Sequence, residues 1–268
     1  MNRESVTLAL KVLRADDSTG GFSRAENEVN LVYTSPYQEG DRIVLESSAK
    51  ECFLVLQVDD ALGASLVFLK DHVLFYTVPF GEKRVCYSPK AFSGSRHLIS
   101  VRVATDEEVK AYRNLALNVM DQQGNTFCFP HAHANVETRD EAVFAARNVI
   151  DGVKENRSHG EWPYQSWGIN RRDDAEITIE FGRDVCIDRV VLYLRADFPH
   201  DNWWKQVTLR FSDNETLVCD LVKTGKGQEI MFGKRIVQWI RLEQLIKSDE
   251  PSPFPALSQF EVYGMPAK

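Results

Sequence analysis

The sequence lacks a basic surplus and any long apolar run. Its 268 residues contain 32 Lys and Arg against 39 Asp and Glu, a formal net charge of −7, and no Lys/Arg cluster. Because nucleic-acid-binding proteins carry a basic face, this balance argues against a nucleic-acid partner. A membrane-spanning helix needs about 18 consecutive apolar residues, and no such run occurs, so we expect no membrane span. The composition is that of an ordinary globular protein with two domains or one large one.

Cysteine is scarce and shows no pairing pattern. The five cysteines include no Cys-x-x-Cys pair and are Cys52, Cys86, Cys128, Cys186 and Cys219. Several lie inside apolar segments, which predicts buried free thiols. The opening stretch MNRESVTLALKVLRADD has only a short apolar patch, which Lys11 and Arg14 interrupt, unlike a signal peptide. We therefore expect a reducing, cytoplasmic setting; a secreted protein whose signal has been removed is the alternative.

Catalytic signatures are missing as well. The sequence has no GxSxG, P-loop, GxGxxG or HExxH motif, so we expect a protein that is not an enzyme. His131 and His133 are two apart and would face the same side of a strand. Some zinc hydrolases use this spacing with an aspartate two positions later, but Asn135 stands there and no cysteine ligand pair accompanies it. We interpret the histidines as part of a linker.

What the first half does contain is a series of short β-strands. In VTLALKVL, Val6, Leu8, Leu10 and Val12 share one face. The segments DRIVLESS, ECFLVLQVDD, ASLVFLK and HVLFYTVPF follow at short intervals, rich in Val, Phe and Leu and separated by Gly, Asp and Pro. This spacing predicts an antiparallel β-sandwich over residues 1–118.

One helix and a linker follow. Thr105 with Glu108 three positions later forms a capping-box pattern, and the spacing predicts a short helix over 106–117. Residues 119–135 carry turn residues and little periodicity, so we expect a linker there. Residues 136–268 then form a second domain, which we expect to fold separately from the first.

The second half is again mostly β and resembles a known family. The segments FAARNVIDG, AEITIEFG, CIDRVVLYLRAD, WKQVTLRFSD, RIVQWIRLEQL and FEVYG occur in an order that is similar to the discoidin-like, or coagulation-factor C-type, branch of the galactose-binding-like domains. The resemblance covers roughly residues 132–264. It implies an eight-stranded antiparallel jelly roll whose loops at one end bind glycans, lipid head groups or proteins, usually without catalysis. The stretch 158–174 is longer than the usual loop of the family.

Aromatic and polar residues gather in two loops of this half. Sugars present apolar C–H faces and fixed hydroxyl groups, so their recognition needs flat rings beside polar forks. Such residues occur in EWPYQSWGIN and in RADFPHDNWW. The candidate ligand residues are Arg195, His200, Asp201, Asn202, Trp203, Trp162, Tyr164 and Trp167. In the alternative interpretation, the tryptophans fill the end of the sandwich and Arg195 pairs with Asp197 or Asp201.

The neighbours Trp203 and Trp204 need separate roles, because a strand turns only one of two adjacent side chains inward. Strict alternation back from Val207, Leu209 and Phe211 would bury Trp203, but it would also bury Lys205. We therefore expect a bulge near residue 205 that buries Trp204 and exposes Trp203.

The resemblance also implies a structural calcium ion. Its candidate ligands are Asp151, Asn156, Ser158 and Glu261. Calcium takes six to eight oxygen ligands, so backbone carbonyls such as those of Asn148 and Lys154 would have to contribute. Alternatively, Asp151 and Gly152 simply make a turn.

Taken together, the residues and the resemblance predict a non-catalytic carbohydrate-binding protein that recognises an oligosaccharide or glycan through loops of the C-terminal jelly roll. A protein–protein interaction scaffold is the first alternative, since the same loops can hold a partner. A glycan-active enzyme with a site between the domains is the weaker third.

Overall fold

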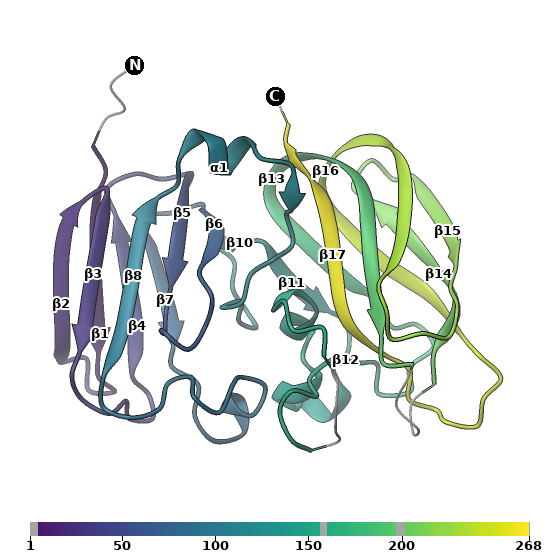
Figure 1. Cartoon of the computed structure of the whole chain (residues 1–268), viewed down its shortest axis with the longest axis horizontal. Coiled ribbons are helices and arrows are strands. Elements are labelled where there is room, and N and C mark those ends of the chain that lie inside the picture. Colours follow the sequence, from purple (N-terminus) through teal and green to yellow (C-terminus); the bar gives the residue numbers. More distant parts are fainter. Residues whose placement is uncertain (1–4, 156–159, 197–201, 268) are drawn as a thin grey trace.

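The computed structural model describes residues 5–155, 160–196 and 202–267. It contains two β-rich bodies that lie side by side (Figure 1). The expected fold class is confirmed: the chain is mostly β, its sheets are antiparallel, and each half is a sandwich with its own hydrophobic core. Within the described part of the chain, no helix is long and apolar enough to cross a membrane.

The N-terminal half packs two sheets face to face. The first has the order β2-β1-β4-β7 and the second the order β10-β6-β5-β8-β3. Their strands are β1 (Thr7–Leu13), β2 (Thr19–Glu26), β3 (Glu28–Tyr33), β4 (Arg42–Ser47), β5 (Cys52–Gln57), β6 (Ser65–Leu69), β7 (Val73–Thr77), β8 (His97–Val103) and β10 (Cys128–Phe129). Leu8, Leu10 and Val12 are fully buried between the sheets, as the alternation in β1 predicts.

The helix between the halves is shorter than expected. α1 spans Asp106–Lys110, and the capping box of Thr105 and Glu108 is present at its start. Ala111 is already extended, and β9 (Arg113–Asn114) pairs with the last strand of the chain. None of the residues of α1 is buried. Because most helical stability comes from packing an apolar face, nothing prolongs the helix to residue 117.

The C-terminal half is built around two long bent strands. One sheet path has the order β12-β17-β13-β16-β14-β15, with β11 also paired to β13. Its strands are β11 (His131–Ala134), β12 (Trp167–Gly168), β13 (Ile177–Leu194), β14 (Trp204–Phe211), β15 (Thr216–Asp220), β16 (Gln228–Lys247) and β17 (Ala256–Pro266). The first part of β13 pairs with β11 and its second part with β17, so the sheet folds over the core. FEVYG lies in β17, the closing strand.

The expected linker is partly structured. Strands β10 and β11 fall within residues 119–135 and add one strand to each half. Three short 3-10 helices follow: η2 (Thr138–Asp140), η3 (Ala142–Phe144) and η4 (Ala146–Ile150). A further one, η1 (Gly81–Arg84), belongs to the N-terminal half. All five cysteines are free thiols, as expected, and Cys86, Cys128 and Cys219 are buried.

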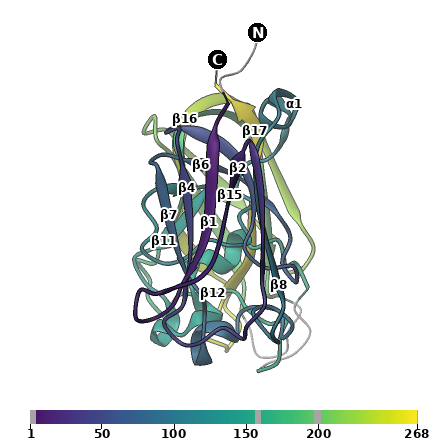
Figure 2. The same cartoon turned by 90° about the vertical axis from the view of Figure 1, so that its left-hand side faces the viewer.

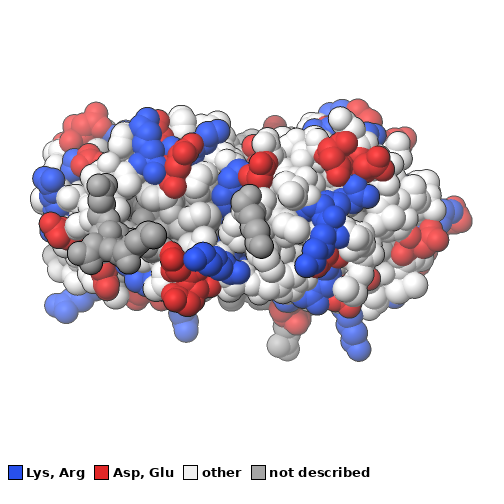
Figure 3. Space-filling model, turned by 90° about the horizontal axis from the view of Figure 1, so that it is seen from above, with Lys and Arg blue, Asp and Glu red and all other residues white. Residues whose placement is uncertain are grey.

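The two ends of the molecule are formed by different elements. α1 and the end of β17 lie at one end, and β12 lies toward the other (Figures 1 and 2). Seen from the α1 end, basic and acidic side chains are interspersed (Figure 3). The described side chains in this view therefore form no continuous basic surface. The loops around β12 form the opposite end, where the candidate site lies.

Candidate functional site

A pocket of about 220 Å³ opens among the loops around β12 and the start of β17. We call it the loop-end pocket. Its defining side chains are Arg139, Phe144, Arg171, Arg195 and Phe254, with Gly168 on its wall. This volume is below the roughly 300–1,000 Å³ of sites for drug-sized ligands, so the pocket suits one sugar ring or a group of similar size.

Two of the three arginines lie over aromatic rings. The guanidinium of Arg171 is 4.7 Å from the ring centre of Phe254, and that of Arg139 is 5.5 Å from the ring centre of Phe144. Arg139 also donates two hydrogen bonds to Glu141, at 2.6 and 2.8 Å, and this contact raises the pKa of Arg139. Among the described residues Arg171 has no ion-pair partner. Its cationic group is therefore available at the rim.

Arg195 follows β13 and is only 3% exposed. Its Nη1 donates to the carbonyl oxygen of Tyr164 at 3.0 Å and to Ser166 Oγ at 3.4 Å. These contacts hold residues 164–166 against the end of β13. Arg195 thus supports the pocket wall, and its contact with a ligand stays a prediction.

Unusual backbone conformations shape the rim. Arg139, Asn170 and Arg171 have positive φ angles of 54°, 47° and 63°. Non-glycine residues seldom adopt this left-handed region, and such strain is often concentrated at binding sites. Thr138 Oγ1 accepts a hydrogen bond from the backbone N–H of Asn170 at 2.9 Å, which joins the two turns. A Cβ atom at Gly168 would lie 2.6 Å from that same oxygen, so only glycine permits this approach.

Two of the predicted ligand residues are instead interior residues. Trp167 is fully buried in the core and donates its Nε1–H to the carbonyl oxygen of Val136. Asn202 is also fully buried; its amide donates to the carbonyl oxygens of Ser248, Glu250 and Ser252, and its Oδ1 accepts from Trp203 N and Ser248 Oγ. Neither can touch a ligand in this conformation. Asn202 works as a clamp for the loop that carries Phe254.

Of the adjacent tryptophans, Trp204 is buried as predicted, whereas Trp203, expected to be exposed, is only half-buried and packs against the core. Trp204 is fully buried and packs 6.2 Å from Trp167, and the pairing of β14 with β16 shifts register between Trp204 and Gln206. Trp203 is half-buried, and its Nε1 donates to Glu250 at 3.1 Å. Its ring borders the clamped loop, outside the loop-end pocket. His200 and Asp201 lie outside the described residues.

Trp162 and Tyr164 belong to a different region. Trp162 is 36% exposed and lines a cavity of about 210 Å³ between the two halves, together with Asp151 and Arg147. Tyr164 is partly buried against the N-terminal core. Of the predicted ligand residues that the structure describes, only Arg195 lines the loop-end pocket, and the aromatic residues lie apart from it.

The described residues of the expected calcium site have protein partners. Asp151 Oδ1 accepts hydrogen bonds from Gln259 Nε2 at 2.7 Å and Val153 N at 2.8 Å, and its Oδ2 accepts from Gln165 Nε2 at 2.9 Å. These donors point protons at the oxygens that a cation would need. Burial raises the pKa of Asp151. The Asp-Gly turn is the role that the structure shows.

Glu261 is likewise engaged. Its Oε1 lies 2.6 Å from Lys154 Nζ, so an ammonium group already neutralises the carboxylate. Asn156 and Ser158 lie outside the described residues. Across the described residues, no cluster of three or more His, Cys, Asp or Glu side chains could hold a metal ion. Calcium therefore stays a prediction from the resemblance, and no part of the proposed function depends on it.

The histidine pair is structural. His131 and His133 lie on β11 with their rings 5.9 Å apart, so they do face the same side. His131 Nδ1 is 2.9 Å from Asp121 Oδ1, and His133 Nε2 is 3.1 Å from Glu180 Oε1. Each ring therefore contacts a different carboxylate, and the pair joins the linker to the second sandwich.

Sequence reasoning did not identify most of the pocket. Phe254 stands between prolines in PSPFPA, where an aromatic residue outside any strand is a weak signal of exposure. Arg139 and Arg171 lie in charged turns, where solvated arginines are common. Their convergence depends on contacts between segments more than 30 residues apart, as between Thr138 and Asn170.

These features define a class: an antiparallel β-sandwich protein with a pocket in the loops at one end of its second sandwich. Residues 130–263, half of the chain, match the family model described as "Domain of unknown function (DUF7402)", and the chain belongs to that family. No curated protein matches the chain.

Several solved structures are similar to the chain. Chitosan-binding module 1 of a chitosanase/glucanase from Paenibacillus sp. IK-5 is 22% identical, covers 56% of this chain and 98% of its own, and has a TM-score of 0.38. CpGH89CBM32-5 from Clostridium perfringens is 17% identical, with coverages of 50% and 94% and a TM-score of 0.40. The lectin binding domain of Lectinolysin is 18% identical, with coverages of 58% and 98% and a TM-score of 0.42. Likenesses at this level assign no ligand to this chain.

Proposed function

We propose that the chain is a carbohydrate-binding protein and that the loop-end pocket holds the sugar. The observation that carries this proposal is the convergence of three arginines and two phenylalanine rings on one pocket of about 220 Å³. Phe254 is 42% exposed and offers a flat apolar face, while Arg171 offers a planar fork of donors beside it. A sugar ring needs both kinds of group at once.

The charge of the pocket points to acidic sugars. The whole chain has a formal net charge of −7, yet Arg139, Arg171 and Arg195 lie together here. Since Arg139 pairs with Glu141 and Arg195 is nearly buried, the exposed guanidinium of Arg171 is the group that would meet the ligand. Guanidinium groups bind carboxylate or sulfate oxygens in pairs, with shorter and stronger hydrogen bonds than they form with hydroxyl groups. We therefore expect uronic-acid or sulfated glycans to bind more tightly than neutral ones.

A glycan array with matched variants tests the proposal. Arg171→Ala should weaken binding of acidic glycans about tenfold, the effect of losing one charge-assisted contact at a binding hot spot. Arg172→Ala is the control. The adjacent Arg172 does not line the pocket, and its guanidinium lies 2.5 Å from the carboxylate of Asp174. A chelator in the array buffer should change nothing, since Asp151 and Glu261 are engaged with protein groups.

Equal binding by the two variants would contradict the pocket assignment. If Arg171→Ala instead abolished capture of a protein partner and free sugar did not compete, the scaffold alternative would replace ours. Turnover of an oligosaccharide would favour the enzyme alternative. Its site would then be the cavity of about 500 Å³ between the halves, where burial raises the pKa of Glu137.

A further inference from the structure

Strand β7 has an open edge. It is the last strand of the sheet order β2-β1-β4-β7, and among the described residues no strand pairs with its outer side. Edge strands are normally protected by charged residues, proline or a bulge. The sequence of β7, VLFYT, has no charge and no proline, and its pairing with β4 is regular. Phe75 at its centre is 60% exposed.

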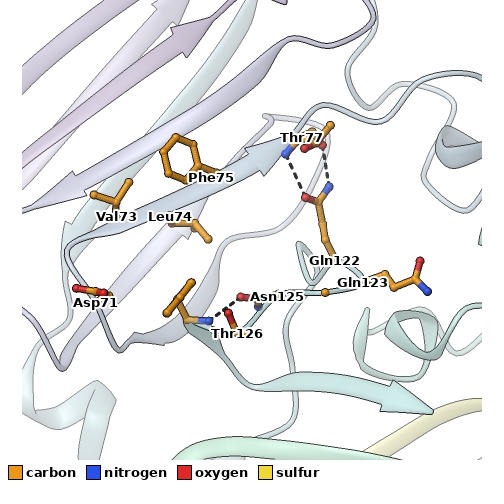
Figure 4. Close-up of a pocket in the computed structure, with 11 residues that line it drawn as sticks. Asp71, Val73, Leu74, Phe75, Thr77, Gln122, Gln123, Asn125 and Thr126 are labelled. Carbon is orange, nitrogen blue, oxygen red and sulfur yellow. Dashed lines mark hydrogen bonds between the residues drawn. The ribbon is translucent and has the colours of Figure 1, made fainter. Parts of the chain in front are cut away.

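At one end of this edge, the side chain of Gln122 takes the place of a neighbouring strand. The backbone N–H of Thr77 donates to Gln122 Oε1 at 3.1 Å, and Gln122 Nε2 donates to the carbonyl oxygen of Thr77 at 2.7 Å (Figure 4). The side-chain amide thus supplies the donor and acceptor of a peptide group. Both backbone groups of Thr77 therefore point away from β4.

The same direction holds for Phe75. In an antiparallel ladder, residues two apart turn their N–H and C=O groups to the same side. The register of β7 with β4 continues without a shift through Val44 and Phe75. The N–H and C=O of Phe75 thus face outward beside the Gln122 amide, and no described residue bonds to them.

A groove runs along this edge. It has a volume of about 460 Å³, with β7 as one wall and residues 122–127 as the other (Figure 4). The second wall is fixed, because Phe127 O accepts from Lys70 N at 2.8 Å and Asn125 Oδ1 accepts from the N–H groups of Phe127 and Cys128. Because this second wall faces β7 across the groove, the open edge suits one extended chain rather than the sheet of a second copy.

We propose that the groove along β7 binds an extended peptide segment of a partner protein by strand addition. The backbone of the peptide pairs with Phe75 and continues the pattern that Gln122 begins at Thr77. An apolar side chain of the peptide covers the exposed rings of Phe75 and Phe127, which are 60% and 49% exposed. This interaction is independent of the sugar pocket.

The test uses displayed random twelve-residue peptides, which are selected on the full chain and then synthesised. Phe75→Pro removes the outward N–H at the centre of the edge and leaves the ladder with β4 intact, since proline is tolerated where the N–H faces outward. Phe75→Val keeps the N–H and an apolar side chain. We expect selected peptides to bind Phe75→Val and to lose about tenfold or more in affinity for Phe75→Pro.

A second measurement tests the proposal on the unaltered chain, so that it can be judged even if Phe75→Pro does not fold. The same peptides are made with N-methyl groups on alternate residues, and one of the two patterns should abolish binding to the unaltered chain. The proposal is overturned if no peptide is enriched, if both methylation patterns bind as well as the parent, or if a folded Phe75→Pro binds equally. A dimer that Phe75→Pro dissociates, seen by analytical ultracentrifugation, would make a second copy the occupant instead.

Discussion

At the scale of residues, Trp204 shows how a local sequence conflict becomes a structural role. Lys205 cannot take a core position, so the strand bulges and turns Trp204 inward, where it is fully buried. The indole of Trp204 fills space against Trp167 in the second core. Its Nε1–H has no hydrogen-bond partner among the described residues, which leaves a buried donor unsatisfied.

The two tryptophans should respond differently to truncation. Trp204→Ala should lower the free energy of unfolding by about 3–5 kcal/mol through loss of a buried aromatic side chain. Trp204→Phe should cost much less, because it keeps most of the packing and removes the unsatisfied donor. Trp203→Ala, which affects a half-buried ring, is the control. Chemical denaturation gives all three values; a larger loss for Trp203→Ala than for Trp204→Ala would reverse the assignment.

His131 should make stability depend on pH. Burial alone lowers the pKa of His131, but the hydrogen bond and charge of Asp121 outweigh it, so the pKa is raised above 6.5. A raised histidine pKa stabilises the fold fully below the unfolded value, about 6.5, and this contribution is lost as the pH rises through the folded pKa. The stability gap between the unaltered protein and His131→Gln should therefore shrink between pH 5.5 and 9. A constant gap in melts across this range would argue against it.

At the scale of elements, α1 depends on its first turn. It has five residues and buries none of them, so the capping box supplies its specific stabilisation. Glu108 Oε2 accepts from Thr105 N at 2.8 Å, and both oxygens of Glu108 accept from Arg102, at 2.8 and 2.5 Å. The side-chain hydrogen bond from Arg102, followed by that from the Thr105 backbone, lowers the pKa of Glu108 to about 2.

Loss of the cap should melt α1 before the sandwiches. Thr105→Ala should lower local stability by about 1 kcal/mol, seen as faster amide hydrogen exchange at Glu108. Since a depressed carboxyl pKa stabilises above the unfolded value of 4.5, the contribution of Glu108 should persist near neutral pH. It should disappear as the pH falls toward about 2. Exchange in the β-strands, measured in the same spectra, should not change.

At the scale of the whole molecule, the halves are closely joined. Arg147 of η4 lies 4.5 Å from the ring centre of Tyr87 and donates to the carbonyl oxygens of Asp121 and Val119. Arg183 of β13 lies 4.5 Å from the ring centre of Phe53, and burial lowers its pKa to about 10. Separate folding of the halves therefore stays a prediction. Because β9 and β11 pair with strands of the second half, a fragment that tests it should begin no later than β9.

A fragment of residues 113–268 should be more stable than one of residues 136–268. The shorter fragment lacks β9 and β11, so β17 and the first part of β13 would each lose a paired strand. Unpaired edges promote aggregation. We expect the longer fragment to melt cooperatively and to remain monomeric in size-exclusion chromatography. Equal melting temperatures and solubility of the two fragments would contradict this reasoning.

The sequence by itself determined the features that depend on neighbours along the chain. Alternation placed Leu8, Leu10 and Val12 in a core, and the Thr105–Glu108 spacing placed a helix start. The conflict at Lys205 was enough to distinguish Trp204 from Trp203. These inferences succeed because strand burial repeats every two residues and capping acts across three, so both are local properties.

Only the tertiary structure decided how distant segments meet. It assigned Asn202 and Trp167 to the interior, since their partners lie on other loops, up to 50 residues away for Asn202. It placed Arg171 over Phe254, a contact between two separate turns. The same residue types would serve equally well on a solvated surface, so composition and spacing cannot select their positions. Long-range packing decides which polar side chains form hydrogen bonds inside the fold and which remain accessible to a ligand.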